Sequence, residues 1–130
     1  MNCFNVEPKI AVNPKDKIKP FVLMNDVEYL PDKFNSVRVI CISHKYSWDG
    51  ATIPRFLWRV VGSKYNPEFL PASMVHDWLC EHKAFIEKDG IKISSDIFRD
   101  ILILYKVPKW KAKMMAAAVR VYQMTQKGWK

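Results

Sequence analysis

The segment SSDIFRDILILY, residues 94–105, constrains the fold more than any other part of the chain. With about 100° per residue, its large apolar side chains point to nearly every side of a helix. These side chains are Ile97, Phe98, Ile101, Leu102, Ile103, Leu104 and Tyr105. Because such a helix must be covered on most of its surface, we expect it at the centre of the fold, over residues 95–106, with Ser94 or Ser95 as its cap.

Two further helices are expected on either side of this central one. Pro71 suits a first helical turn and Gly90 is a C-terminal signal, so the first helix is predicted over residues 71 to about 88. Pro108 opens a third helix that is expected to end close to Gly128.

Residues 1–50 are predicted to form a small antiparallel sheet or meander. The segments KPFVLMND and SVRVICIS are rich in β-branched and bulky apolar residues, and Asn13-Pro14 and Asn25-Asp26 supply breaks. In the second segment apolar residues occupy both alternating sets of positions, so we expect both faces of that strand to be at least partly covered.

The 130 residues are therefore predicted to form one α+β domain, 1–130. Residues 1–50 are expected to be mainly β and turns and residues 51–130 mainly α, with the sheet packed on the three-helix region. The cysteines Cys3, Cys41 and Cys80 form no CxxC pair, so we expect reduced, mostly buried thiols in a cytoplasmic setting. The N-terminal segment lacks the features of a signal peptide, and no apolar run approaches the roughly 18 residues that span a bilayer.

The formal net charge of +8 is concentrated at the C-terminal end of the chain. The basic and acidic residues of the first 105 positions nearly cancel, whereas residues 106–130 contain basic residues and no acidic ones. On the third helix four of these basic residues fall within about 40° of one another, namely Lys109, Lys113, Arg120 and Lys127. The inner face of that helix is expected to consist of Trp110, Met114, Ala117 and Val121. The basic stripe is a candidate site for anions such as phosphate, and the alternative is an ordinary solvated face.

The segment PASMVHDWLC, residues 71–80, places His76 and Asp77 inside an apolar run. On a helix His76 falls at the rim of the apolar arc, where a base with a tuned pKa is useful, while His82 falls within the arc. Since the first two helices are expected to be antiparallel neighbours, we expect Asp96 to accept a hydrogen bond from one nitrogen of the His76 imidazole and so to orient that ring. The alternatives are a structural histidine and an aspartate that serves the helix dipole.

With these motifs in view, the chain resembles a domain family of unknown function found mainly in bacteriophages and prophages. That family carries a T-D-x-A-S-x-P-R loop, an A-x-x-x-H-D-x-L-Y helix start, an A-D-x-x-F helix and a C-terminal helix that ends near an aromatic residue. The counterparts here, within residues 46–129, are WDGATIPRFLW, ASMVHDWLC, SDIFRDIL and AAAVRVYQMTQKGW, with Trp48 in place of the threonine and Cys80 in place of the tyrosine. The resemblance implies a phage protein of the host cytoplasm or virion. A host or phage protein is one expected partner; the other, which follows from the charge and not from the resemblance, is an anionic surface of phospholipid or nucleic acid at the basic C-terminal helix.

A second likeness concerns mechanism. The segments HDWLC and SSDIF are similar to the H-D-x-x-Y and later A-D arrangement of calcium-dependent phospholipases that cut the sn-2 ester. This resemblance implies that His76 is the catalytic base, that Asp77 binds a divalent cation such as Ca²⁺ or Mg²⁺, and that Asp96 orients His76. Those enzymes complete the metal shell with a glycine-rich loop, whereas the equivalent stretch here has only Gly62, and Asp49 is expected to substitute as a metal ligand.

Three functions stay open on these observations. The chain is a metal-assisted hydrolase of the ester or phospholipid type, or a non-catalytic phage structural or host-interaction module in which the same residues form a buried hydrogen-bond network. The third function is the binding of anions or nucleic acid through the basic C-terminal helix.

Overall fold

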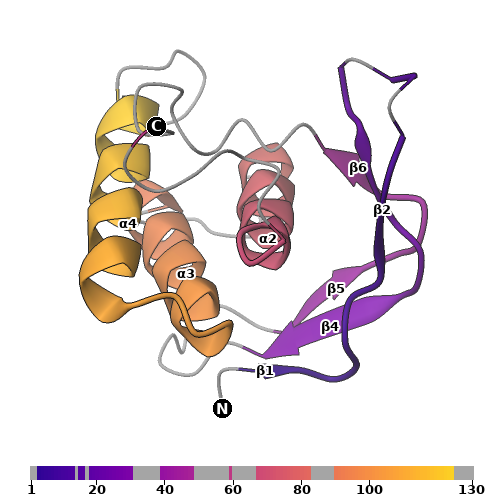
Figure 1. Ribbon diagram of the computed structural model, residues 1–130, viewed down its shortest axis with the longest axis horizontal. Coiled ribbons are helices and arrows are strands. Elements are labelled where there is room, and N and C mark those ends of the chain that lie inside the picture. Colours follow the sequence, from indigo (N-terminus) through magenta and orange to yellow (C-terminus); the bar gives the residue numbers. More distant parts are fainter. Residues whose placement is uncertain are drawn as a thin grey trace.

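The computed structural model describes residues 3–13, 15–16, 18–30, 39–48, 59, 67–82 and 90–124. The elements, in chain order, are β1 (Cys3–Phe4), β2 (Ile10–Val12), β3 (Phe21–Leu23), β4 (Val27–Leu30), β5 (Ile40–Ile42), β6 (Ser47–Trp48), α2 (Leu70–Glu81), α3 (Gly90–Leu104) and α4 (Lys109–Met124). Figure 1 shows the strands on one side of the molecule and the helices on the other, with α2 nearest the strands. The α+β class with a β-rich N-terminal part and three helices is confirmed.

The strands form two antiparallel sheets of three strands each, in the orders β1-β4-β5 and β2-β3-β6. The two faces of the strand around residue 40 differ more in their exposure than expected. Ile40 and Ile42 are buried, whereas Val39, which precedes them, and Cys41, which lies between them, are exposed. One face of this antiparallel sheet packs on the core and the other meets solvent, which is the usual arrangement for such sheets.

Side-chain hydrogen bonds join the β-rich part to α2. The indole Nε1–H of Trp48, which is fully buried, donates to Ser73 Oγ over 3.1 Å. The hydroxyl of Tyr46 donates to Glu81 Oε2 over 2.8 Å, and Glu81 also pairs with Lys19. Burial, with the Glu81 carboxylate beside it, raises the pKa of Tyr46 far above its ordinary value, so the phenol remains a donor.

Helix α3 packs against both α2 and α4, as expected for the most apolar helix. Its buried side chains include Ile97, Phe98, Ile101 and Leu102. They join the large residues of the strands and of α2 in one hydrophobic core. The central position predicted for this segment is therefore confirmed.

The ends of α2 and α3 differ from the prediction. Helix α2 ends at Glu81 because His82 leaves the helical region, with φ −114° and ψ 57°. The imidazole of His82 is exposed, stacks on Trp78 at a centroid distance of 4.1 Å and donates from Nδ1 to the Trp78 carbonyl, so its predicted place in the apolar arc is wrong. Residues 83–89, which include the predicted last turn of this helix, lie outside the described residues.

Helix α3 begins at Gly90, about one turn before the predicted cap. The hydroxyls of Ser94 and Ser95 do not cap it, because they donate back to the carbonyls of Ile91 and Lys92, three residues earlier. The helix ends at Leu104, and Lys106 follows in the left-handed region with φ 67°.

The predicted inner face of α4 is wrong at three of its four positions, and only Met114 packs, half-buried, against the core. The buried residues of this helix are Ala112, Met115, Ala116, Val119 and Gln123. By contrast, Trp110 and Val121 are 64% and 62% exposed, and Ala117 is exposed as well. Apolar residues occur on two sides of this helix. The side with Ala112 and Ala116 is the buried one, because these small side chains allow close packing on α3. The end of α4 predicted near Gly128 falls on residues 125–130, which lie outside the described residues.

The thiols are less buried than predicted. Cys41 is exposed, and Cys3 and Cys80 are half-buried; all three are free. Among the helices that the structure describes, none has the length and apolar content to cross a bilayer.

Candidate functional site

His76 lies at the contact between α2 and α4 and is only 2% exposed. Its Nε2 atom is 3.0 Å from Oε1 of Gln123, on α4, and its Nδ1 atom is 3.8 Å from Sγ of Cys80, one turn further along α2. The amide of Gln123 also donates to Cys80 Sγ over 2.9 Å. These three residues therefore form a closed ring of polar contacts, which we call the His76 network.

The surroundings of His76 favour the protonated form of its imidazole. Burial alone lowers the pKa of this group, but hydrogen bonding with Asp77 and Cys80, together with the electrostatic attraction of the same two groups, outweighs burial and raises the pKa to about 10. The Nδ1 atom is 3.9 Å from Oδ1 of Asp77, and the ring packs edge-on against Phe98 of α3 at a centroid distance of 5.6 Å. The Nε2–H group then donates to the Gln123 carbonyl oxygen.

Of the four residues predicted for the hydrolase site, the structure describes His76, Asp77 and Asp96, and it does not bring these three together. Asp77 is adjacent to His76, as expected. Asp96, however, pairs with Arg99 at 3.5 Å on α3, and not with His76, so its predicted orienting contact is wrong. Asp49 lies outside the described residues.

The described residues by themselves do not form a metal site. In the part of the chain that the structure describes, no group of three or more His, Cys, Asp and Glu side chains is arranged to hold a cation. Asp77 has the His76 imidazolium as its neighbour, and a positive charge there disfavours a bound cation. The divalent cation stays a prediction that no observation here supports.

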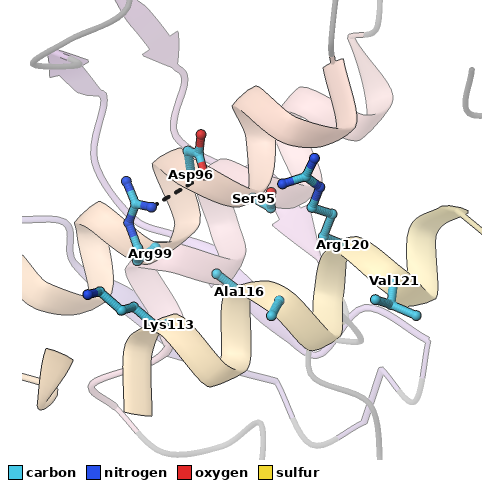
Figure 2. A pocket seen from close by; sticks show the side chains of 8 residues that line it. Ser95, Asp96, Arg99, Lys113, Ala116, Arg120 and Val121 are labelled. Atoms are coloured by element: carbon cyan, nitrogen blue, oxygen red, sulfur yellow. Dashed lines mark hydrogen bonds and ion pairs between the residues drawn. The ribbon is translucent and has the colours of Figure 1, made fainter. Parts of the chain in front are cut away.

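A second polar site lies between α3 and α4, where the sequence pattern predicts a basic stripe. It is an open hollow of about 240 Å³, which we call the basic hollow. Its lining residues are Ser95, Asp96, Arg99, Lys113, Ala116, Ala117, Arg120 and Val121. Figure 2 shows Arg120 reaching from α4 towards Ser95 on α3, while Arg99 and Lys113 lie further along the same two helices.

The cations of the basic hollow differ in their partners. Arg99 contacts two carboxylates, with Nη2 at 3.1 Å from Oδ1 of Asp100 and Nη1 at 3.5 Å from Oδ1 of Asp96. Lys113 and Arg120 are exposed, and within the described residues neither forms an ion pair or a hydrogen bond. The hollow therefore presents two unpaired positive charges beside a paired one.

The remaining members of the predicted basic stripe lie elsewhere. Lys109 is the first residue of α4 and is exposed, but it does not line the hollow. Lys127 falls outside the described residues. The stripe therefore contributes Lys113 and Arg120 to the hollow.

Two residues of these sites were missed in the sequence. Gln123 was not expected as the partner of His76. It lies on the same side of α4 as Ala112, Ala116 and Val119, so it is recognisable as a buried polar residue once that side is known to face the core. Arg99 was expected only as a neighbour of Asp96 and Asp100. No local signal places it beside Lys113, because the two residues belong to different helices.

A family model described as "Protein of unknown function (DUF1353)" matches residues 21–119. The match agrees with the resemblance to an uncharacterised domain family. It begins at β3, well before residue 46, where the recognisable motifs begin. The phage origin stays a prediction.

The chain is also similar to two uncharacterized proteins of Sinorhizobium fredii. It is 35% identical to protein y4jT over 77 residues, which is 57% of this chain and 21% of y4jT. It is 31% identical to protein y4iH over 74 residues, which is 57% of this chain and 29% of y4iH. The chain thus spans less than a third of the length of these curated relatives. No solved structure matches it significantly.

Proposed function

The chain belongs to the DUF1353 family of proteins of unknown function, and from that premise we propose that it is an anion-binding module. Its α3–α4 face takes a phosphate group that a larger partner presents. The observation that carries this proposal is the pair Lys113 and Arg120, two cations without a partner in the described residues, beside the same hollow.

The size and charge of the basic hollow suit a phosphate group. Its volume of about 240 Å³ is below the roughly 300–1,000 Å³ of pockets that enclose a drug-sized molecule. A guanidinium donates to phosphate oxygens in a bidentate manner, and an ammonium adds a point charge. The negative charge of Asp96, which would oppose an anion, is offset by Arg99.

The hydrolase is supported less well by the same geometry. A general base must accept a proton, whereas Asp77 and Cys80 raise the pKa of His76 and so favour its protonated form. It is also buried, with Gln123 on one nitrogen and Cys80 near the other. These contacts support the reading of His76 as part of a buried hydrogen-bond network, and the hydrolase stays a prediction.

The proposal is tested by titrating the protein with inorganic phosphate while its backbone amide signals are followed by NMR. The signals of residues 95–99 and 113–121 are expected to shift and to saturate. In the Lys113→Ser/Arg120→Ser variant the affinity is expected to fall about tenfold or more, because each charge-assisted hydrogen bond contributes about 1.5–3 kcal/mol.

The matched control is Lys9→Ser/Lys15→Ser, which removes the same net charge from two exposed lysines in the β-rich part. It should titrate like the wild type. Equal phosphate affinity in the Lys113→Ser/Arg120→Ser variant and the wild type would contradict the proposal, as would shifts of the wild type that never saturate.

A further inference from the structure

Helix α4 carries a second, uncovered apolar stripe. Trp110, Val121 and Met124 are 64%, 62% and 67% exposed, among the most exposed large apolar side chains of the described residues. With about 100° per residue, the three fall within about 60° of one another on the helix. They extend over nearly the whole length of α4, which is about 21 Å between Trp110 and Met124 at 1.5 Å per residue. We call these three residues the apolar stripe.

The basic residues of α4 adjoin this stripe directly. Lys113 and Arg120 lie about 60° and 80° from Trp110 around the helix, next to the position of Met124. Val121 belongs to both features, because it also lines the basic hollow. The exposed side of α4 therefore combines a row of cations with a row of large apolar side chains. In Figure 1 this helix lies at the edge of the molecule, on the side away from the strands.

The combination of cations and large apolar side chains on α4 favours one of the two polyanions that a basic surface can bind, a nucleic acid or an anionic bilayer. A nucleic acid offers phosphates to the cations and a base to stack on Trp110, but it offers no apolar surface to Val121 and Met124. The surface of an anionic bilayer offers phosphates in the headgroup layer and an apolar layer directly beneath. Helices that lie in this interface carry Lys and Arg on one face and Trp and aliphatic residues on the other.

We propose that the exposed side of α4 docks on the surface of an anionic phospholipid bilayer, with headgroup phosphates at Lys113 and Arg120 and the apolar stripe inserted beside them. This inference rests on the proposed function, since the phosphate that the basic hollow takes is here the phosphate of a lipid headgroup. Electrostatic attraction brings the face to the membrane, and burial of Trp110, Val121 and Met124 adds the part of the affinity that salt does not screen.

The test is co-sedimentation of the protein with vesicles of equal parts phosphatidylcholine and phosphatidylglycerol, with phosphatidylcholine vesicles as the neutral comparison. The wild type is expected to bind the anionic vesicles and to bind the neutral ones much more weakly. The Trp110→Ser/Met124→Ser variant is expected to lose vesicle affinity by about tenfold or more, while its NMR shifts with inorganic phosphate stay as in the wild type, because neither residue lines the basic hollow. The control is Ile18→Ser/Met24→Ser, which removes two exposed apolar residues, 76% and 60% exposed, from the β-rich part and should bind like the wild type.

The outcomes separate this inference from the proposed function. If the variant of the apolar stripe sediments with anionic vesicles as well as the wild type does, the docking is overturned and phosphate binding is untouched. Absence of vesicle binding, together with salt-dependent binding of a DNA duplex, overturns the bilayer as partner in favour of nucleic acid. If Lys113→Ser/Arg120→Ser keeps the phosphate-induced shifts, the proposed function itself fails, and the docking fails with it.

Discussion

His76 is held by groups from two helices. On α2 it is next to Asp77 and one turn before Cys80, and Gln123 reaches it from α4. A buried polar side chain that lacks a hydrogen-bond partner lowers the free energy of unfolding by about 1–3 kcal/mol. Each member of this ring therefore stabilises the fold by providing a hydrogen-bond partner for the others. The ring explains why a histidine stands in the apolar run of residues 71–80. It pairs with the one polar residue on the buried face of α4.

The raised pKa of His76 predicts how the stability of the protein depends on pH. Its pKa is about 10 in the folded state, against an ordinary value of 6.5 that applies to the unfolded chain, so the folded state binds the proton more tightly. The stabilisation is therefore complete below about pH 6.5 and is lost as the pH rises towards 10. Urea denaturation at several pH values should show the free energy of unfolding falling across this window. In His76→Gln that fall should be smaller.

The matched control for this prediction is His82→Gln, because the exposed ring of His82 is not part of the network. It should leave the pH profile as in the wild type. An unchanged slope between pH 6.5 and 10 in His76→Gln would show that the imidazole is neutral in the folded protein, and a base at this position would then be worth reconsidering.

At the scale of elements, the end of α3 shows how a helix closes without glycine. The N–H of Lys106 donates to Ile103 O, and the N–H of Val107 donates to Leu102 O over 3.0 Å. This is the pattern in which the residue after the helix adopts the left-handed conformation, and Lys106 does so with φ 67°. A residue with a Cβ atom pays a steric cost at that position, which glycine avoids.

Lys106→Gly should therefore stabilise the protein, by about 0.5–1 kcal/mol. The change relieves the left-handed backbone at the turn into α4, and Lys106 is exposed, so no packing is lost. Thermal or urea denaturation measures the gain. Lys92→Gly, on an exposed position inside α3, is the opposite control and should destabilise by about 1 kcal/mol. A loss of stability in Lys106→Gly would argue that the lysine side chain itself makes a contact worth more than the backbone strain.

At the scale of the whole molecule, the β-rich part and the helices share one core. Phe21, Trp48, Phe69 and Phe98 come from both halves of the chain and belong to the same buried cluster. The hydrogen bond from Trp48 to Ser73 is a buried polar link between them, and Ser73 in turn donates to the carbonyl of Leu70 over 3.0 Å. We therefore predict that residues 1–130 unfold in a single transition, as one domain.

A double-mutant cycle of Trp48→Phe and Ser73→Ala measures this link. Each single change should destabilise by about 1–3 kcal/mol, because it removes the bond and, at Trp48, part of the packing. The two should couple by about 0.5–1.5 kcal/mol, since they act through one contact. The free energies come from urea denaturation followed by circular dichroism and by fluorescence together.

The control for this cycle is Trp110→Phe, whose indole is mostly exposed and which should change stability by less than about 0.5 kcal/mol. If the circular dichroism and fluorescence transitions separate, the strands and helices unfold independently. In that case the single-domain prediction is wrong. Additive effects of Trp48→Phe and Ser73→Ala would mean that their hydrogen bond contributes no net stability.

The sequence by itself determined the kinds of elements in this protein and their order. Spacing of apolar residues marks helix or strand through a local period of about 3.6 or 2 residues, and this identified the β-rich start, three helices and the central α3. The basic residues of α4 followed from the same angles, because Lys113 and Arg120 are seven residues apart on one helix.

Only the tertiary structure decided which faces meet. Helix α4 has two apolar stripes, and the packing of α3 determines which of them is buried, so Trp110 is exposed where an inner position was expected. The partner of His76 is Gln123, 47 residues away along the chain, and Asp96 pairs within its own helix. No local period carries such information, because a contact between two helices depends on their relative placement, which is set by how all the buried surfaces pack at once.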